Sequence, residues 1–165
     1  MEADLKDKLD EAKFFLLEME KHAHQIDPFR YSLSAFLNAV YNFIEYMRKK
    51  AKEIPEEKKW IKDELEKIKY HEYLYAQRRL STHHRPIADR GPADVYQNQS
   101  GANSTLYYLT GTAATVRILT PTPQSSAPFL WYFEDFLDED VISISRKWVH
   151  ALEEMPAKFL TKFGH

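Results

Sequence analysis

The densest group of residues that could act on a phosphate lies between positions 78 and 90. This stretch holds four arginines and two histidines against a single acid, Asp89. A guanidinium presents a planar fork of donors that matches phosphate oxygens, and it stays charged. An imidazole can take or give a proton near neutral pH. Together these groups suffice for attack of an RNA 2′-hydroxyl on its own phosphate, without a metal or a cofactor.

Arg78 and His83 are the pair that we expect to carry this chemistry. The histidine would move the proton of the 2′-hydroxyl, and the arginine would stabilise charge on the phosphate. Residues five positions apart lie about 140° apart on an ideal helix. The two side chains therefore meet only if the helix ends between them, which Ser81 and Thr82 favour.

Arg79, His84 and Arg85 are the residues that we expect to add contacts to an RNA backbone. The pair Arg79 and His84 has the same spacing as Arg78 and His83, so both registers stay open. A purely structural interpretation is also open, because cations at the end of a helix complement its dipole. No metal-binding residues are predicted.

The elements that must position this segment are long helices. Residues 1–85 contain no glycine and two prolines, and apolar residues recur there three and four positions apart, as on one face of a helix. Asp27 followed by Pro28 predicts the N-cap and first position of a second helix. Ile54–Pro55 predicts its end, because a residue before proline avoids helical backbone. We therefore expect three long helices within residues 1–86, the third, 56–81, in one or two pieces.

The second half of the chain predicts a different structure. Residues 87–103 are polar and loop-like, 104–110 and 114–120 form a predicted β-hairpin, and 129–133 is a candidate third strand. A last helix is expected over residues 139–160. The prediction is a single, mainly α domain over residues 1–165. It is an antiparallel four-helix bundle with a small β-hairpin insertion, within residues 87–133, before the last helix.

Composition excludes several classes of protein. The chain has no cysteine, so a disulfide scaffold, a thiolate metal site and a cysteine nucleophile are ruled out. No apolar stretch approaches the roughly 20 residues that span a bilayer, and we expect a cytoplasmic protein without membrane contact. The net charge is −2, from 23 Lys plus Arg against 25 Asp plus Glu. Any binding of nucleic acid must therefore come from a local patch or from an oligomer.

The first two predicted helices share a pattern made of Phe14-Phe15, Met19, Asp27-Pro28-Phe29, Tyr31, Leu33 to Leu37 and Ala39, followed by Trp60 and the Arg–His segment before Pro86. This pattern resembles the start of bacterial members of the HEPN superfamily, named for higher eukaryote and prokaryote nucleotide-binding proteins. Trp131 to Asp135 and the last helix are also similar. The resemblance is strongest over residues 11–86.

This resemblance implies a HEPN-like bundle with Arg78 as the family arginine and His83 as the family histidine. HEPN nucleases work as dimers in which two such motifs face each other across a two-fold axis. The implied function is RNA binding, with metal-independent endoribonuclease activity at an Arg/His dimer site. The implied partners are RNA, a second copy of the chain, and an antitoxin or another protein. The alternative function is a non-catalytic interaction module in a phage-defence, toxin–antitoxin or stress system.

Overall fold

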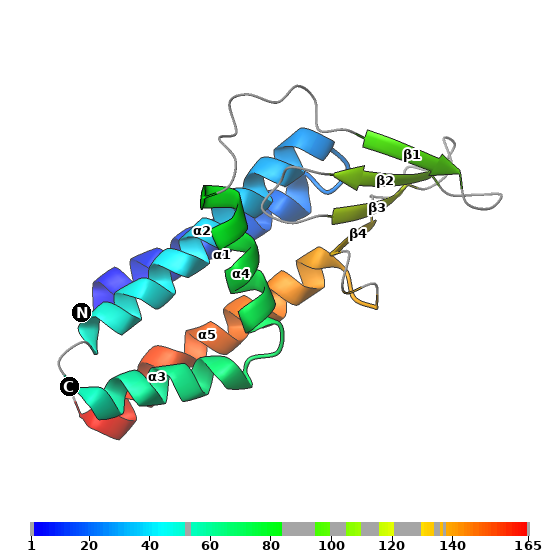
Figure 1. The fold of residues 1–165 in the computed structure, drawn as a ribbon. Helices are drawn as coiled ribbons and strands as arrows, with labels where there is room; N and C mark the ends of the chain where they lie inside the picture. The colour runs from blue at the N-terminus through cyan, green and yellow to red at the C-terminus, as the bar shows by residue number, and fades with distance from the viewer. Residues whose placement is uncertain are drawn as a thin grey trace.

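The protein is mainly helical, with a small sheet at one end of the helices (Figure 1). The computed structural model describes residues 2–51, 54–83, 95–99, 105–109, 116–120, 130–133, 136 and 138–164. Its helices are α1 (Glu2–Lys21), α2 (Ile26–Lys50), α3 (Pro55–Lys67), α4 (His71–His83) and α5 (Val141–Phe163). Its strands are β1 (Val95–Gln99), β2 (Thr105–Leu109), β3 (Val116–Thr120) and β4 (Leu130–Phe133).

Helix α1 packs between α2 and α5, and their apolar faces form the core. The buried stripe of α1 follows the predicted spacing, from Leu5 through Ala12 to Met19, and Ala23 continues it in the turn after the helix. The hydroxyl of Tyr46 near the end of α2 donates to Asp4 near the start of α1 at 2.7 Å, so these two helices run antiparallel. On α5, Trp148 and Leu152 are at most 1% exposed. The predicted core helices are thus confirmed, with boundaries shifted by a few residues.

The start of α2 differs in detail from the prediction. The helix begins at Ile26, and its N-cap is Gln25, whose side chain makes no capping hydrogen bond. Asp27 therefore lies inside the first turn, where its carboxylate complements the helix dipole and pairs with Arg30 at 3.3 Å. A carboxylate in the first turn offsets part of the loss of a capping side chain.

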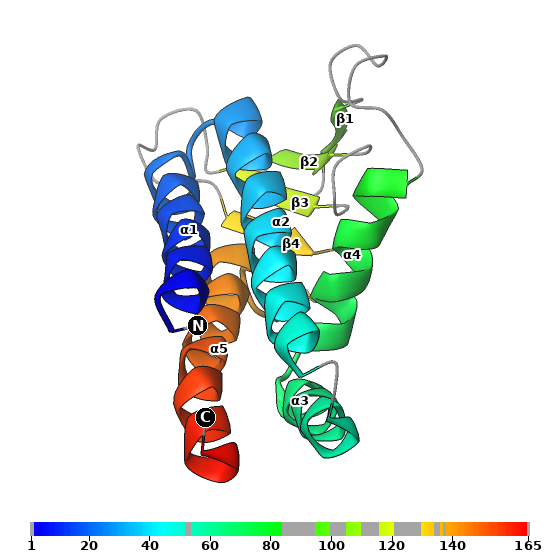
Figure 2. The same ribbon diagram turned by 90° about the vertical axis from the view of Figure 1, so that its left-hand side faces the viewer.

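The predicted third helix is two helices. Its first piece, α3, ends at Lys67, and α4 starts at His71 after a sharp change of direction (Figures 1 and 2). Between them Tyr70 has a φ of 69°, a left-handed backbone conformation that is unfavourable for a large side chain. The ring of Tyr70 packs edge-on against Phe136 at 4.8 Å, and its hydroxyl donates to Glu139 at 3.3 Å. These contacts hold the break in place.

The four strands form one antiparallel sheet in the order β1-β2-β3-β4. The pair of β2 and β3 corresponds to the predicted hairpin, and β4 to the predicted third strand. Strand β1 was not expected, and the prediction of a loop throughout residues 87–103 is wrong at Val95–Gln99. The segment VYQNQ lacks a strong apolar alternation, but it pairs along its whole length with β2, from Val95 opposite Leu109 to Gln99 opposite Thr105.

Trp131 joins the sheet to the helices. Its ring is 1% exposed and stacks on Phe29 of α2, with ring centroids 3.8 Å apart and planes 11° apart. Its indole N–H donates to the backbone carbonyl of Ala23, in the turn between α1 and α2, at 2.7 Å. One side chain therefore fixes β4 against the end of the helical layer by both burial and a buried hydrogen bond.

We expect Trp131→Phe to lower the free energy of unfolding by about 1–3 kcal/mol, because it leaves the buried carbonyl of Ala23 without its donor. The measurement is chemical unfolding followed by circular dichroism. Trp60→Phe is the matched control, since the Trp60 ring packs against the rings of Phe159 and Phe163. An equal loss in both variants would show that the indole hydrogen bond contributes nothing beyond ring volume.

Candidate functional site

The polar side chains of α2 and α4 meet along one line, which we call the α2–α4 seam. On α2 the polar positions are three and four residues apart, so they share one face of that helix. The same spacing holds on α4. The seam comprises Asn38, Tyr41, Glu45 and Arg48 of α2 with His71, Tyr75 and Arg78 of α4.

Arg78 lies at one end of the seam, where Asn38 and Tyr41 orient its guanidinium. Its Nε donates to Asn38 Oδ1 at 3.1 Å, and its guanidinium carbon lies 3.6 Å from the centre of the Tyr41 ring. The Asn38 amide is itself oriented, because its Nδ2 donates to the Ser34 carbonyl at 2.9 Å. Arg78 is partly exposed. The structure thus holds the predicted phosphate-binding arginine in a defined position at the protein surface.

The helix that carries Arg78 does not end before the predicted partner, His83. Helix α4 continues through His83, so the expectation that the helix ends between the two residues is wrong. On a continuous helix the directions of Arg78 and His83 differ by about 140°. The side chains of Arg79 and His83 lie outside the described part of the structure, as do all of His84 and Arg85.

The middle of the seam is a closed triangle of hydrogen bonds. Arg48 Nη1 donates to Glu45 Oε1 at 2.9 Å and to the Tyr75 hydroxyl at 2.7 Å. The Tyr75 hydroxyl in turn donates to Glu45 Oε1 at 2.8 Å. Burial raises the pKa of Tyr75, and its bond to Glu45 raises that pKa further, so the phenol keeps its proton at neutral pH. The triangle can bind and orient, but Tyr75 cannot act as a base.

His71 closes the other end of the seam and is 7% exposed. Its Nδ1 accepts a hydrogen bond from Trp148 Nε1 of α5 at 3.3 Å, which requires a neutral ring protonated on Nε2. Burial lowers the pKa of His71 to about 4, and the positive charge of Arg48 lowers it too. At neutral pH this histidine is a fixed neutral spacer between α2, α4 and α5.

Most of the seam was missed by sequence reasoning. The available signal was the polar spacing of Asn38, Tyr41, Glu45 and Arg48, which runs beside the apolar stripe of the same helix. The same spacing is typical of a solvent-exposed helix face, so it could not show whether these residues form a functional site or only face water. Only the approach of α4, about 30 to 40 residues later in the chain, gives these residues their partners.

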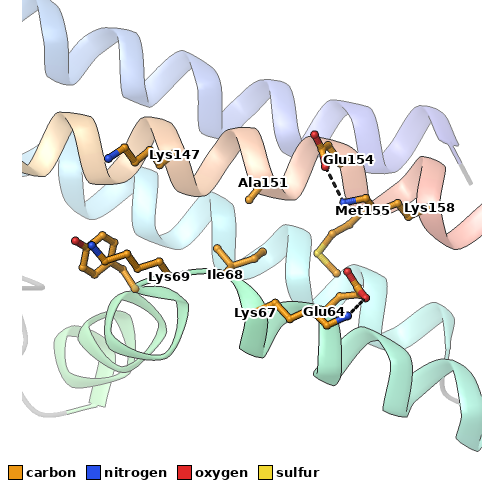
Figure 3. Close-up of a pocket in the computed structure, with 10 residues that line it drawn as sticks. Glu64, Lys67, Ile68, Lys69, Lys147, Ala151, Glu154, Met155 and Lys158 are labelled. Atoms are coloured by element: carbon orange, nitrogen blue, oxygen red, sulfur yellow. Dashed lines mark hydrogen bonds and ion pairs between the residues drawn. The ribbon is translucent and has the colours of Figure 1, made fainter.

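A second concave region lies between α3 and α5 and has a volume of about 340 Å³ (Figure 3). Ile68, Ala151 and Met155 give it an apolar wall, and four lysines line it. Three of the lysines are paired with acids: Lys67 with Glu64 at 2.5 Å, Lys158 with Glu154 at 2.7 Å, and Lys147 with Glu139. The fourth, Lys69, lies over the Tyr70 ring at 4.4 Å. Because these acids offset most of the positive charge, the cavity has no concentrated charge for an anionic ligand.

Comparisons with protein-family models, with curated proteins and with solved structures gave no match to this chain. Among the described residues, no group of three or more histidines and carboxylates is placed to hold a metal ion. Within the same ranges, no helix has both the length and the apolar character that crossing a bilayer requires. The interpretation of the site therefore depends on the geometry of the seam.

The state of His71 predicts how stability depends on pH. Its pKa is about 4 in the folded protein and about 6.5 when unfolded, so the unfolded chain binds the proton more tightly. The His71 contribution should be complete above about pH 6.5 and should be lost as the pH falls toward 4, by up to about 3 kcal/mol. Chemical unfolding at pH 7.5 and at pH 4.5 measures this loss.

His71→Gln should flatten this pH dependence, because the amide does not titrate and its oxygen can still accept from Trp148. His150→Gln is the control, since the His150 side chain is 77% exposed and should leave the slope unchanged. Equal slopes in the His71 variant and the wild type would contradict the assignment.

Proposed function

We propose that this protein is an RNA-binding protein with a HEPN-like helical bundle, and that Arg78 contacts the phosphate backbone. The observation that carries the proposal is the orientation of the Arg78 guanidinium by Asn38 and Tyr41 at a partly exposed position. An arginine already held in one conformation loses little further side-chain freedom on binding, so its contact with phosphate contributes more to affinity.

The position of Arg78 in the chain supports the same function. It is the first cation of the arginine-rich segment, and Arg79, His84 and Arg85 follow it within seven residues. The triangle at the centre of the seam fixes α4, which carries the start of this segment, against α2. A local cationic patch of this kind gives a chain of net charge −2 a means of binding nucleic acid.

Cleavage is the stronger form of this proposal. In it, His83 takes the proton of a ribose 2′-hydroxyl, and that oxygen attacks the adjacent phosphorus. Arg78 stabilises the added negative charge, and the 5′-oxygen leaves with the proton that His83 then gives up, giving a 2′,3′-cyclic phosphate and a 5′-hydroxyl. Because backbone positions five residues apart on one helix point about 140° apart, we propose that Arg78 of one chain and His83 of a second chain act on one phosphate.

RNA binding is tested by Arg78→Ala with Arg146→Ala as the matched control. Arg146 pairs with Glu20 at the junction of α1 and α5, away from the seam, and its side chain is 60% exposed. We expect Arg78→Ala to weaken binding about tenfold for RNAs of different sequence. We also expect the slope of the logarithm of the binding constant against the logarithm of salt concentration to fall by the amount of about one phosphate contact. Arg79→Ala should act in the same direction, most strongly at low salt.

Asn38→Ala separates orientation from charge, because it keeps the Arg78 guanidinium but removes the partner of its Nε. We expect a smaller loss of affinity with an unchanged salt slope, measured by fluorescence anisotropy. Equal affinities of the Arg78 and Arg146 variants at every salt concentration would overturn the binding proposal.

Cleavage is tested with labelled RNA in the presence of EDTA. We expect products that end in a cyclic phosphate, and we expect no cleavage of an RNA carrying 2′-deoxyribose at the cut position. His83→Ala should abolish cleavage but leave binding within about threefold, whereas His150→Ala should change neither. Binding without any product in the wild type would overturn cleavage and leave RNA binding alone.

A further inference from the structure

The side of α1 opposite the core carries a second regular stripe. Asp7, Asp10, Phe14, Leu17 and Lys21 are three, four, three and four positions apart, and all five are exposed. We call this set the outer stripe of α1. Spacing of this kind places side chains on one line along a helix, as at a helix–helix contact.

The centre of the outer stripe is apolar and open. Phe14 is 56% exposed and Leu17 is 61% exposed, so both are more than half exposed. The neighbours of α1 lie on its other sides: Asp4 contacts Tyr46 of α2, and Lys13 and Glu20 pair with Glu153 and Arg146 of α5. An adjacent pair of large apolar side chains gives this side of α1 a small apolar patch, the kind of surface that a second molecule can cover.

The order of charges along the stripe identifies that molecule. Acids lie at the N-terminal end, apolar residues in the middle and a lysine at the C-terminal end. An antiparallel copy of α1, related by a two-fold axis between positions 14 and 17, places Phe14 opposite Leu17 of the other chain. The same axis places Asp10 opposite Lys21 and Asp7 opposite His24, which is exposed in the turn after α1. A parallel copy would place Asp10 against Asp10 and Lys21 against Lys21.

We infer that the outer stripe of α1 is a self-association surface that binds a second copy of this chain in the antiparallel direction. Its contacts are isologous, so each apolar and each charged pair occurs twice. The Asp10 and Lys21 side chains are 52% and 66% exposed, and both can reach across to the second chain. Within one chain, Lys21 lies 3.4 Å from Glu18 and Asp10 lies 3.8 Å from Lys13, so the new pair competes with two long, exposed ion pairs.

This inference does not depend on RNA binding. Figure 2 shows α1 and α4 on opposite sides of α2, so a dimer joined through α1 carries its two α4 helices far from the two-fold axis. Each chain would then present its own Arg78 surface, and the dimer would bind RNA at two separate places. A cleft shared by Arg78 and His83 would need a further contact between chains.

Charge reversal tests the pairing directly. We expect the wild type to dimerise with increasing concentration in sedimentation velocity. Asp10→Lys and Lys21→Asp should each raise the dissociation constant at least tenfold, because each creates two like-charge pairs. The double variant Asp10→Lys with Lys21→Asp should return to within about threefold of the wild type. Asp63→Lys and Lys62→Asp on the exposed face of α3 are the controls and should have no effect.

Cross-linking tests the direction of the helices. The chain has no cysteine, so Asp10→Cys and Lys21→Cys each introduce a single thiol. The antiparallel contact predicts a disulfide dimer when the two variants are mixed under oxidation, and little when either is alone. A wild type that stays monomeric at every concentration would overturn the inference, as would cross-linking of each variant with itself. RNA binding by the charge-reversed variants, measured in parallel, shows separately whether the proposed function holds.

Discussion

Helix α2 packs against the apolar core with one side and against the polar face of α4 with the adjacent side, and the rest of the structure depends on these two contacts. One side of the helix buries Phe29, Phe36 and Phe43 completely against α1, α5 and Trp131. The adjacent side carries the polar residues that contact α4. Because the helical period fixes the angle between the two sides, the position of α4 is set by the same helix that forms the core. The orientation of Arg78 therefore follows from the packing of α2.

The seam joins α4 to the core with polar rather than apolar contacts. Arg48 is neutralised by Glu45 within the triangle, and His71 is kept neutral by burial. The Arg48–Glu45 pair and His71 therefore add no net charge to the interface. The Arg78 guanidinium lies at its end. Buried and half-buried polar groups of this kind favour one relative position of two helices, because a shifted position would leave donors and acceptors without partners.

The sequence predicts the parts of this fold that depend on local patterns. The apolar stripes of α1, α2 and α5 were readable because their period is regular over five or more turns. The sequence left open whether the third helix is continuous or broken before α4. Tyrosine rarely adopts the left-handed backbone that Tyr70 has at the break, and the contacts that support it come from Phe136 and Glu139, much later in the chain. The seam could not be predicted, because its contacts join residues that are far apart in the chain. Arg78 was identified from its charge and spacing, whereas its contacts with Asn38 and Tyr41 appear only in three dimensions.

The place of α1 between α2 and α5 has a consequence for how the chain acquires its structure. The ion pairs of Lys13 with Glu153 and of Glu20 with Arg146 join the first helix to the last. During synthesis from the N-terminus, α1 and α2 can associate early, but the side of α1 that faces α5 remains exposed until α5 has been made, since Glu20 and Arg146 are 126 residues apart. The nascent protein therefore carries an open apolar surface until α5 is available, and its core closes only then.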